Sequence, residues 1–179
     1  MKPLTYPVIG RISQKFRDNI MNVRPGSVED IEWISKLLIE GANEGHYLPT
    51  IKFQAKELVQ SVVVNGEVQM VKLRGSVQAP EFIKMDLTVA EMDGFPASFL
   101  ICCKDANEVE IHLAGTLKKF RKNGCFNRLV IEAVTNYGNS RIYARCYKKS
   151  SWAINGLEAI NFKITKDGNP VELTLAGKA

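Results

Sequence analysis

The 179-residue chain has few residues of the kinds that build metal centres, disulfide frameworks or membrane spans. It has only two histidines, so a zinc site would have to be assembled from scattered groups, and no metal is expected. Four cysteines lack the paired spacing of a zinc ribbon or a redox motif and are expected to be reduced: Cys102, Cys103, Cys125 and Cys146. Apolar runs such as 99–103 are far shorter than the roughly 20 residues of a membrane helix. We therefore expect a cytoplasmic protein.

What is present is the composition of an ordinary globular domain. Hydrophobic residues make up 45% and charged residues 24%, which excludes disordered and collagen-like classes. The net charge of +5 favours phosphate-bearing partners without requiring nucleic acid. A basic stretch could be a solvated face, a phosphate site or a nucleic-acid contact, and it contains Lys118, Lys119, Arg121, Lys122 and Arg128.

Residues 1–21 stand apart, because Met21 is a second methionine directly before the first expected strand. Apolar residues recur there at helical spacing, namely Ile9, Ile12, Phe16 and Ile20. A docked helix and a frayed tail both fit this pattern. We expect an N-terminal extension at 1–21 and a single domain at 22–179.

Periodicity and turn residues divide the domain into short strands and four helices. Ser27 and Asp30 form an N-cap pattern for the first helix, and Gly41 is its expected end. Asp93-Gly94 is the clearest hairpin signal, although Pro96 favours a loop longer than two residues. The expected strands are 22–24, 68–73, 82–92, 98–104, 108–113, 141–147, 162–165 and 171–175, and the expected helices are 28–40, 53–64, 124–136 and 151–160. We summarise the order as β-α-α-β-β-β-α-β-α-β-β, a mixed α/β (α+β) domain.

A basic junction containing a glycine joins a strand to a helix in the middle of the chain. A helix N-terminus exposes unpaired N–H groups and a positive dipole end, so such a junction suits a phosphate. Leu113-Ala114 at the strand end and Arg121-x-x-Gly124 before the helix resemble the signature of the GNAT superfamily of acetyl-CoA-dependent N-acyltransferases. Val23-Arg24-Pro25 and residues 153–162 resemble that family's opening strand and late helix, so the resemblance spans about residues 22–175.

The resemblance implies a GNAT-like fold, with a mostly antiparallel central sheet flanked by helices, and acetyl-CoA as co-substrate without a metal. Main-chain groups of the loop would hold the pyrophosphate, and the strand end would pair with the pantetheine arm. The residues implied for cofactor binding are Leu113, Ala114, Gly115, Arg121, Lys122, Asn123, Gly124, Cys125, Phe126 and Ser150.

Candidate catalytic groups lie on the strand before the junction and at a later turn. Glu110 falls where the resembling family carries a general base, and His112 shares its strand face. Ile111 and Leu113 are expected together on the other face. Tyr147 lies at the turn that the resemblance places near the thiol. The plainer alternatives are a solvated carboxylate face for Glu110 and a packed side chain for His112.

Four positions depart from the family pattern or allow a second interpretation. Phe126 stands where the loop has a small residue, so it could crowd the pyrophosphate or point into the core. Leu157 stands where the family carries its acid tyrosine, so the thiolate must obtain its proton elsewhere. Ser150 is also an N-cap candidate, and Cys125 could be a nucleophile or structural filler.

Three functions fit these residues. The first is transfer of an acetyl group from acetyl-CoA to an amine of a small molecule or protein by direct attack in a ternary complex. The second is a GNAT-fold protein that binds CoA or a protein partner with little or no catalysis. The third, supported by charge alone, is a basic nucleic-acid-associated module. For the acetyltransferase we expect neither a nucleic-acid nor a membrane partner, and a homodimer is one open alternative. The acceptor contacts are expected in residues 40–50.

Overall fold

The structure is a computed structural model that describes residues 20–74 and 77–177. The N-terminal extension expected at 1–21 therefore lies outside the described residues, apart from Ile20 and Met21, and Met21 begins the first strand. The elements follow the order β1 (Met21–Pro25), a 3-10 turn η1 (Val28–Asp30), α1 (Ile31–Asn43), α2 (Ile51–Asn65), β2 (Glu67–Arg74), β3 (Val77–Met92), β4 (Phe95–Asp105), β5 (Glu108–Thr116), η2 (Lys118–Phe120), α3 (Cys125–Tyr137), β6 (Arg141–Cys146), α4 (Ser151–Glu158), β7 (Phe162–Lys166) and β8 (Val171–Leu175). Four strands lie between α2 and α3, in agreement with the four expected ranges 68–73, 82–92, 98–104 and 108–113; the summarised order has one strand too few there.

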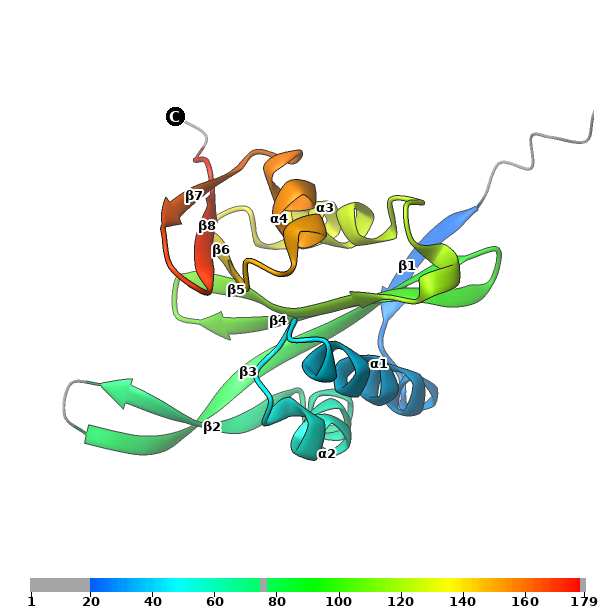
Figure 1. Cartoon of the computed structure of the whole chain (residues 1–179). Coiled ribbons are helices and arrows are strands. Elements are labelled where there is room, and N and C mark those ends of the chain that lie inside the picture. The colour runs from blue at the N-terminus through cyan, green and yellow to red at the C-terminus, as the bar shows by residue number, and fades with distance from the viewer. Residues whose placement is uncertain (1–19, 75–76, 178–179) are drawn as a thin grey trace, which may run out of the picture.

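The eight strands form one sheet in the order β1-β3-β4-β5-β6-β8-β7, with β2 paired to β3. All pairs are antiparallel except β5 with β6. Helices α1 and α2 cover one face of the sheet, and α3 and α4 cover the other (Figure 1). Each face has its own apolar core, so the mixed α/β architecture and mostly antiparallel sheet expected from the sequence are confirmed.

Local signals place most element ends within a few residues, with two corrections. The capping box of Ser27 and Asp30 is present, but α1 continues through Gly41 to Asn43. The ring of Tyr47 approaches the site of a Cβ at Gly41 to 2.3 Å, so this glycine serves packing rather than helix termination. Asp93-Gly94 is a two-residue turn with both φ angles positive, and Pro96 lies in β4 at a register shift.

A bulge in β5 alters the face of its last residues. Ile101 pairs with Leu113 and Cys102 with Ile111, which leaves His112 as the extra residue. Ile111 therefore joins the core under α3 and α4, whereas Leu113 joins the core under α1 and α2. The expectation that these two side chains share a face is wrong, because strict alternation fails at a bulge.

Strands β5 and β6 pair only over Glu108–Ile111 and Arg141–Ala144. Beyond this point the two strands separate, and within the described residues no strand pairs with the outer edge of β5 from His112 to Thr116. No helix in the described ranges is long and apolar enough to cross a membrane.

Candidate functional site

The loop between η2 and α3 has the backbone of an anion-binding turn. Lys122 and Gly124 both have positive φ angles, 66° and 79°, and α3 begins directly afterwards at Cys125. Within the described residues, no backbone acceptor bonds to the N–H groups of Lys122, Asn123 or Gly124. These groups, with the unpaired N–H groups of the first turn of α3, can bind the oxygens of a phosphate.

Two cations of the basic stretch belong to this loop. Arg121 donates from Nε to the carbonyl of Thr116 at 3.3 Å, and neither Arg121 nor Lys122 has an ion-pair partner in the described part of the chain. Lys119 instead lies over the rings of Phe95 and Phe120, and Arg128 pairs with Glu132 on α3. The Asn123 side chain donates to the carbonyl of Phe120, so it supports the loop from within.

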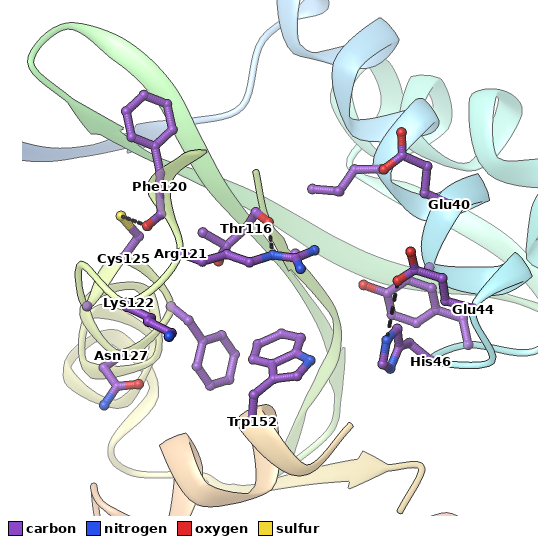
Figure 2. Close-up of a pocket in the computed structure, with 16 residues that line it drawn as sticks. Glu40, Glu44, His46, Thr116, Phe120, Arg121, Lys122, Cys125, Asn127 and Trp152 are labelled. Carbon is purple, nitrogen blue, oxygen red and sulfur yellow. Dashed lines mark hydrogen bonds and ion pairs between the residues drawn. The ribbon is translucent and has the colours of Figure 1, made fainter. Parts of the chain in front are cut away.

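A cavity of about 430 Å³ opens beside this loop. Glu40 and Glu44 lie on the α1 side and Lys122 and Asn127 on the α3 side (Figure 2). Its wall also contains Gly115 and Thr116 at the end of β5, so the free strand edge borders the same space as the loop. The remaining lining residues are Leu37, Gly41, His46, Tyr47, Phe120, Arg121, Gly124, Cys125, Phe126 and Trp152.

A smaller cavity of about 50 Å³ continues to the point where β5 and β6 separate. It shares four wall residues with the larger one, namely His46, Tyr47, Phe126 and Trp152. Its far end contains Ala114, Ala144, Ser150 and Leu157. The two cavities thus form a path from the cationic loop to the strand separation.

Of the three strand-end residues expected to bind the cofactor, Ala114 and Gly115 line the path and Leu113 lies in the core. The Ala114 carbonyl accepts a hydrogen bond from the Tyr47 hydroxyl, and Gly115 lines the larger cavity. A Cβ at Gly115 would meet Phe99 at 2.7 Å and Leu37 at 2.9 Å, so a side chain here would force these two buried side chains to shift. Leu113 is buried beneath α1 and lines neither cavity.

Phe126 and Cys125 both point inward from the first turn of α3. Phe126 is buried and makes an edge-to-face contact with Trp152, with centroids 5.4 Å apart. Of the two orientations considered for Phe126, the structure has the inward one, with one side on the cavity wall. Burial raises the pKa of the Cys125 thiol, which disfavours the thiolate that a nucleophile needs.

Glu110 lies in a closed ionic cluster. Arg145 donates to both of its carboxylate oxygens at 2.9 Å, Tyr143 donates at 3.3 Å, and His112 Nδ1 lies 3.5 Å away. Burial raises the pKa of Glu110, but the hydrogen bonds and charges of His112 and Arg145 outweigh it and lower that pKa to about 2. Glu110 lines neither cavity and is a weak proton acceptor at this pKa, so its role as general base stays a prediction.

His112 belongs to the same cluster, although part of it lines the smaller cavity. Burial lowers its pKa, but hydrogen bonding to Cys103 and Glu110 outweighs burial and raises that pKa to about 10. His112 is therefore protonated at neutral pH and balances Glu110. Tyr147 lines neither cavity, so the structure does not bring it together with the loop residues.

Ser150 occupies the N-cap position of α4 but does not use its side chain as a cap. Its carbonyl accepts the first helical hydrogen bonds, from the N–H groups of Ala153 and Ile154. Its hydroxyl lies 2.9 Å from Nδ1 of His46, a residue 104 positions earlier. Leu157 is fully buried beside it and offers no polar atom.

Residues 40–50, where acceptor contacts are expected, supply five residues to the larger cavity, namely Glu40, Gly41, Glu44, His46 and Tyr47. Sequence reasoning missed the pairing of His46 with Ser150. The only local signal was the spacing of Glu44 and His46, two residues apart like Glu110 and His112. No group of three or more His, Cys, Asp or Glu side chains in the described part of the chain is arranged to hold a metal ion.

Comparison of the sequence with protein-family models and with curated proteins finds no match. Solved structures do match. The PaiA N-acetyltransferase from Thermoplasma acidophilum in complex with coenzyme A is 15% identical, with a TM-score of 0.60 over 87% of this chain and 97% of that one. Spermidine N-acetyltransferase from Vibrio cholerae, in complex with CoA and spermine, is 10% identical, with a TM-score of 0.59 over 86% and 92%. The acetyltransferase from Thermus thermophilus is 15% identical, with a TM-score of 0.59 over 86% and 94%.

These similarities define the fold as that of the GNAT N-acetyltransferases. They extend over nearly the whole length of the matched chains, so the similarity covers the complete fold rather than one motif. The resemblance in fold inferred from the strand-loop-helix junction is confirmed.

Proposed function

We propose that this protein is a GNAT-type N-acetyltransferase that transfers an acetyl group from acetyl-CoA to an amine acceptor by direct attack in a ternary complex. The observation that carries the proposal is the path from the cationic loop to the separation of β5 and β6. A long thioester with phosphates at one end fits such a path. The fold shared with acetyltransferases crystallised with CoA supports the same substrate.

Different residues of the cavity walls bind the pyrophosphate of acetyl-CoA, its pantetheine arm with the thioester, and the acceptor amine. The N–H groups from Lys122 to Cys125, with the Arg121 guanidinium, bind the pyrophosphate. The unpaired edge of β5 pairs with the amides of the pantetheine arm, which places the thioester near the strand separation. Glu40 and Glu44 give the opposite wall two carboxylates, which attract a cationic amine. The spermine complex of a structural neighbour supports an amine acceptor.

Isothermal titration calorimetry of the purified protein with acetyl-CoA, CoA and dephospho-CoA tests the site without knowledge of the acceptor. We expect micromolar binding of acetyl-CoA, and weaker binding of dephospho-CoA measures the contribution of the 3′-phosphate. A screen of primary amines that follows CoA thiol release then tests turnover. No binding at millimolar acetyl-CoA would overturn the proposal.

The substitution Gly124→Glu tests the loop, and Gly66→Glu is its matched control. Both glycines have positive φ angles, 79° and 68°, and neither has an atom within 4 Å of an added Cβ. Both variants therefore carry the same backbone strain and the same charge, but Gly66 ends α2 and lines neither cavity. We expect Gly124→Glu to abolish measurable acetyl-CoA binding and Gly66→Glu to retain it. Equal affinities in the two variants would show that the loop does not bind the phosphates.

The alternatives have distinct outcomes. Micromolar CoA binding without turnover of any amine would support a GNAT-fold protein that binds CoA without catalysis. DNA binding that falls steeply with salt and is not displaced by CoA would support the nucleic-acid module.

A further inference from the structure

His46 and Ser150 come together from distant parts of the chain. His46 lies between α1 and α2, Ser150 lies directly before α4, and Nδ1 of the histidine is 2.9 Å from Oγ of the serine. Both side chains line the smaller cavity, and His46 also lines the larger one. The contact therefore spans the path at the end opposite the cationic loop.

The orientation of Ser150 is not explained by helix capping. A capping serine accepts a hydrogen bond from a backbone N–H in the first helical turn. Ser150 makes no such bond, is 5% exposed, and has His46 as the described partner of its hydroxyl. The hydroxyl is thus held beside the place where an extended thioester, anchored at the loop, would end.

The second ring nitrogen of His46 faces the more open side. Nε2 lies 3.5 Å from Oε2 of Glu44, and the two side chains are 22% and 48% exposed. This separation exceeds a strong hydrogen bond of about 2.7–3.2 Å, so Glu44 does not occupy Nε2 with a strong hydrogen bond, and the exposure of the two side chains gives an amine access to that nitrogen. One ring therefore connects the open cavity with a buried hydroxyl.

The charged and titratable groups around His46 come from several elements. The nearest charge is Glu44, and the Lys149 side chain passes within 3.6 Å of a Cβ placed on Gly45. The others on the walls of the two cavities are Glu40, Tyr47, Arg121, Lys122, Cys125, His112, Arg145 and Cys146. Glu44 is the charged group that acts directly on the ring, because within the described residues it is the one among these groups that pairs with His46.

We propose that His46 and Ser150 are the proton-transfer pair of this site, with His46 accepting a proton from the acceptor amine and Ser150 delivering a proton to sulfur. The inference rests on the proposed function and deepens it. Leu157 cannot supply that proton, and Glu110 lines neither cavity.

The proton balance closes with a neutral amine. The amine nitrogen bonds to the thioester carbon, and the carbon–sulfur bond breaks with its electron pair going to sulfur. The nitrogen loses one proton to Nε2 of His46, Nδ1 releases its proton to Oγ of Ser150, and the serine hydroxyl proton goes to sulfur. The products are the amide and the CoA thiol. The ring returns to its starting tautomer by proton exchange with water.

The kinetic test compares His46→Gln, Ser150→Ala and the double variant, using acetyl-CoA and the best amine of the screen. We expect kcat to fall about 100-fold for His46→Gln and about 10-fold for Ser150→Ala, with the acetyl-CoA Kd unchanged within about twofold. The double variant should lose no more than His46→Gln, because a relay acts as one unit.

Ser151→Ala is the matched control, since the neighbouring serine is exposed and lines neither cavity. Its kcat should stay within about twofold of the wild type. Wild-type kcat in His46→Gln, additive losses in the double variant, or losses accompanied by an equal loss of acetyl-CoA affinity would each overturn the relay.

A second measurement needs no acceptor. Thiolate absorbance of bound CoA reports the pKa of its thiol, and we expect Ser150→Ala to raise that pKa by about one unit because a donor to the thiolate is lost. Ser151→Ala should not change it. An unchanged thiol pKa in Ser150→Ala would overturn the role of Ser150 alone. A wild-type protein that binds no CoA would overturn the proposed function and the relay with it.

Discussion

Each of the two histidines of this chain pairs with a nearby glutamate, but the two pairs differ in their surroundings. Each lies two residues after a glutamate, and in each pair the closest nitrogen–oxygen distance is 3.5 Å. Around Glu110 and His112 the pair is closed, because Arg145 occupies both carboxylate oxygens and the two side chains are 10% and 18% exposed. Around Glu44 and His46 it is open to the cavity, and no other cation pairs with Glu44 in the described residues. Burial and a third partner therefore separate a structural pair from one that can exchange protons.

Removal of the glutamate charge should destabilise the protein more in the closed pair, Glu110 with His112, than in the open pair, Glu44 with His46. Glu110→Gln leaves the His112 cation, which is 18% exposed, without its partner, whereas Arg145 is 51% exposed and stays solvated; we expect the change to lower the free energy of unfolding by about 3 kcal/mol. The matched variant Glu44→Gln should cost less than about 1 kcal/mol, because Glu44 is exposed. Urea unfolding of both variants measures the difference. Equal losses would show that the two pairs do not differ as described.

The pH dependence of stability should show the closed pair as well. The pKa of His112 is raised from 6.5 to about 10, so its contribution is complete below pH 6.5 and is lost as the pH rises toward 10. We expect the free energy of unfolding to fall by about 2 kcal/mol over this range in the wild type, and less in His112→Gln. The pKa of Glu110 is lowered from 4.5 to about 2, so its contribution is present above pH 4.5 and is lost below it. Identical slopes between pH 6.5 and 10 in wild type and His112→Gln would contradict the ionic description of the closed pair.

Local patterns predicted much of the fold and of the loop, because their physical causes lie within a few residues. Ser27 and Asp30 form the capping box of the 3-10 turn that leads into α1, and Gly124 supplies the positive φ that ends the loop and begins α3. The bulge at His112 was not predictable, since it depends on how β4 pairs with β5 rather than on alternation within β5. Gly41 was misread for a similar reason, because the ring that requires a glycine there approaches from outside the helix.

The chemistry of the site was less predictable than its backbone. Glu110 and Arg145 meet because β5 and β6 are neighbours in the sheet, and that neighbourhood is a property of the topology. The contact of His46 with Ser150 joins residues 104 positions apart. Without the fold, Ser150 remains a helix cap and His46 one residue of a loop.

The smallest effect concerns a hydroxyl beside the open pair. The Tyr47 hydroxyl donates to the carbonyl of Ala114, on the part of the β5 edge that none of the described strands covers. Burial raises the pKa of Tyr47, so the hydroxyl keeps its proton and occupies this carbonyl at neutral pH. If the carbonyl pairs with acetyl-CoA, the substrate must displace the hydroxyl before it can bind there.

Tyr47→Phe should then tighten acetyl-CoA binding by about fivefold, since one neutral hydrogen bond contributes about 1 kcal/mol and no longer has to be broken. Tyr143→Phe is the matched control in the closed cluster, because it removes a hydroxyl that donates to Glu110 and lines neither cavity. It should leave the Kd unchanged. Calorimetry with acetyl-CoA measures both variants. Weaker binding by Tyr47→Phe would mean that the hydroxyl binds the substrate directly, and the open region would then contain one more ligand-binding group rather than a competitor for the strand edge.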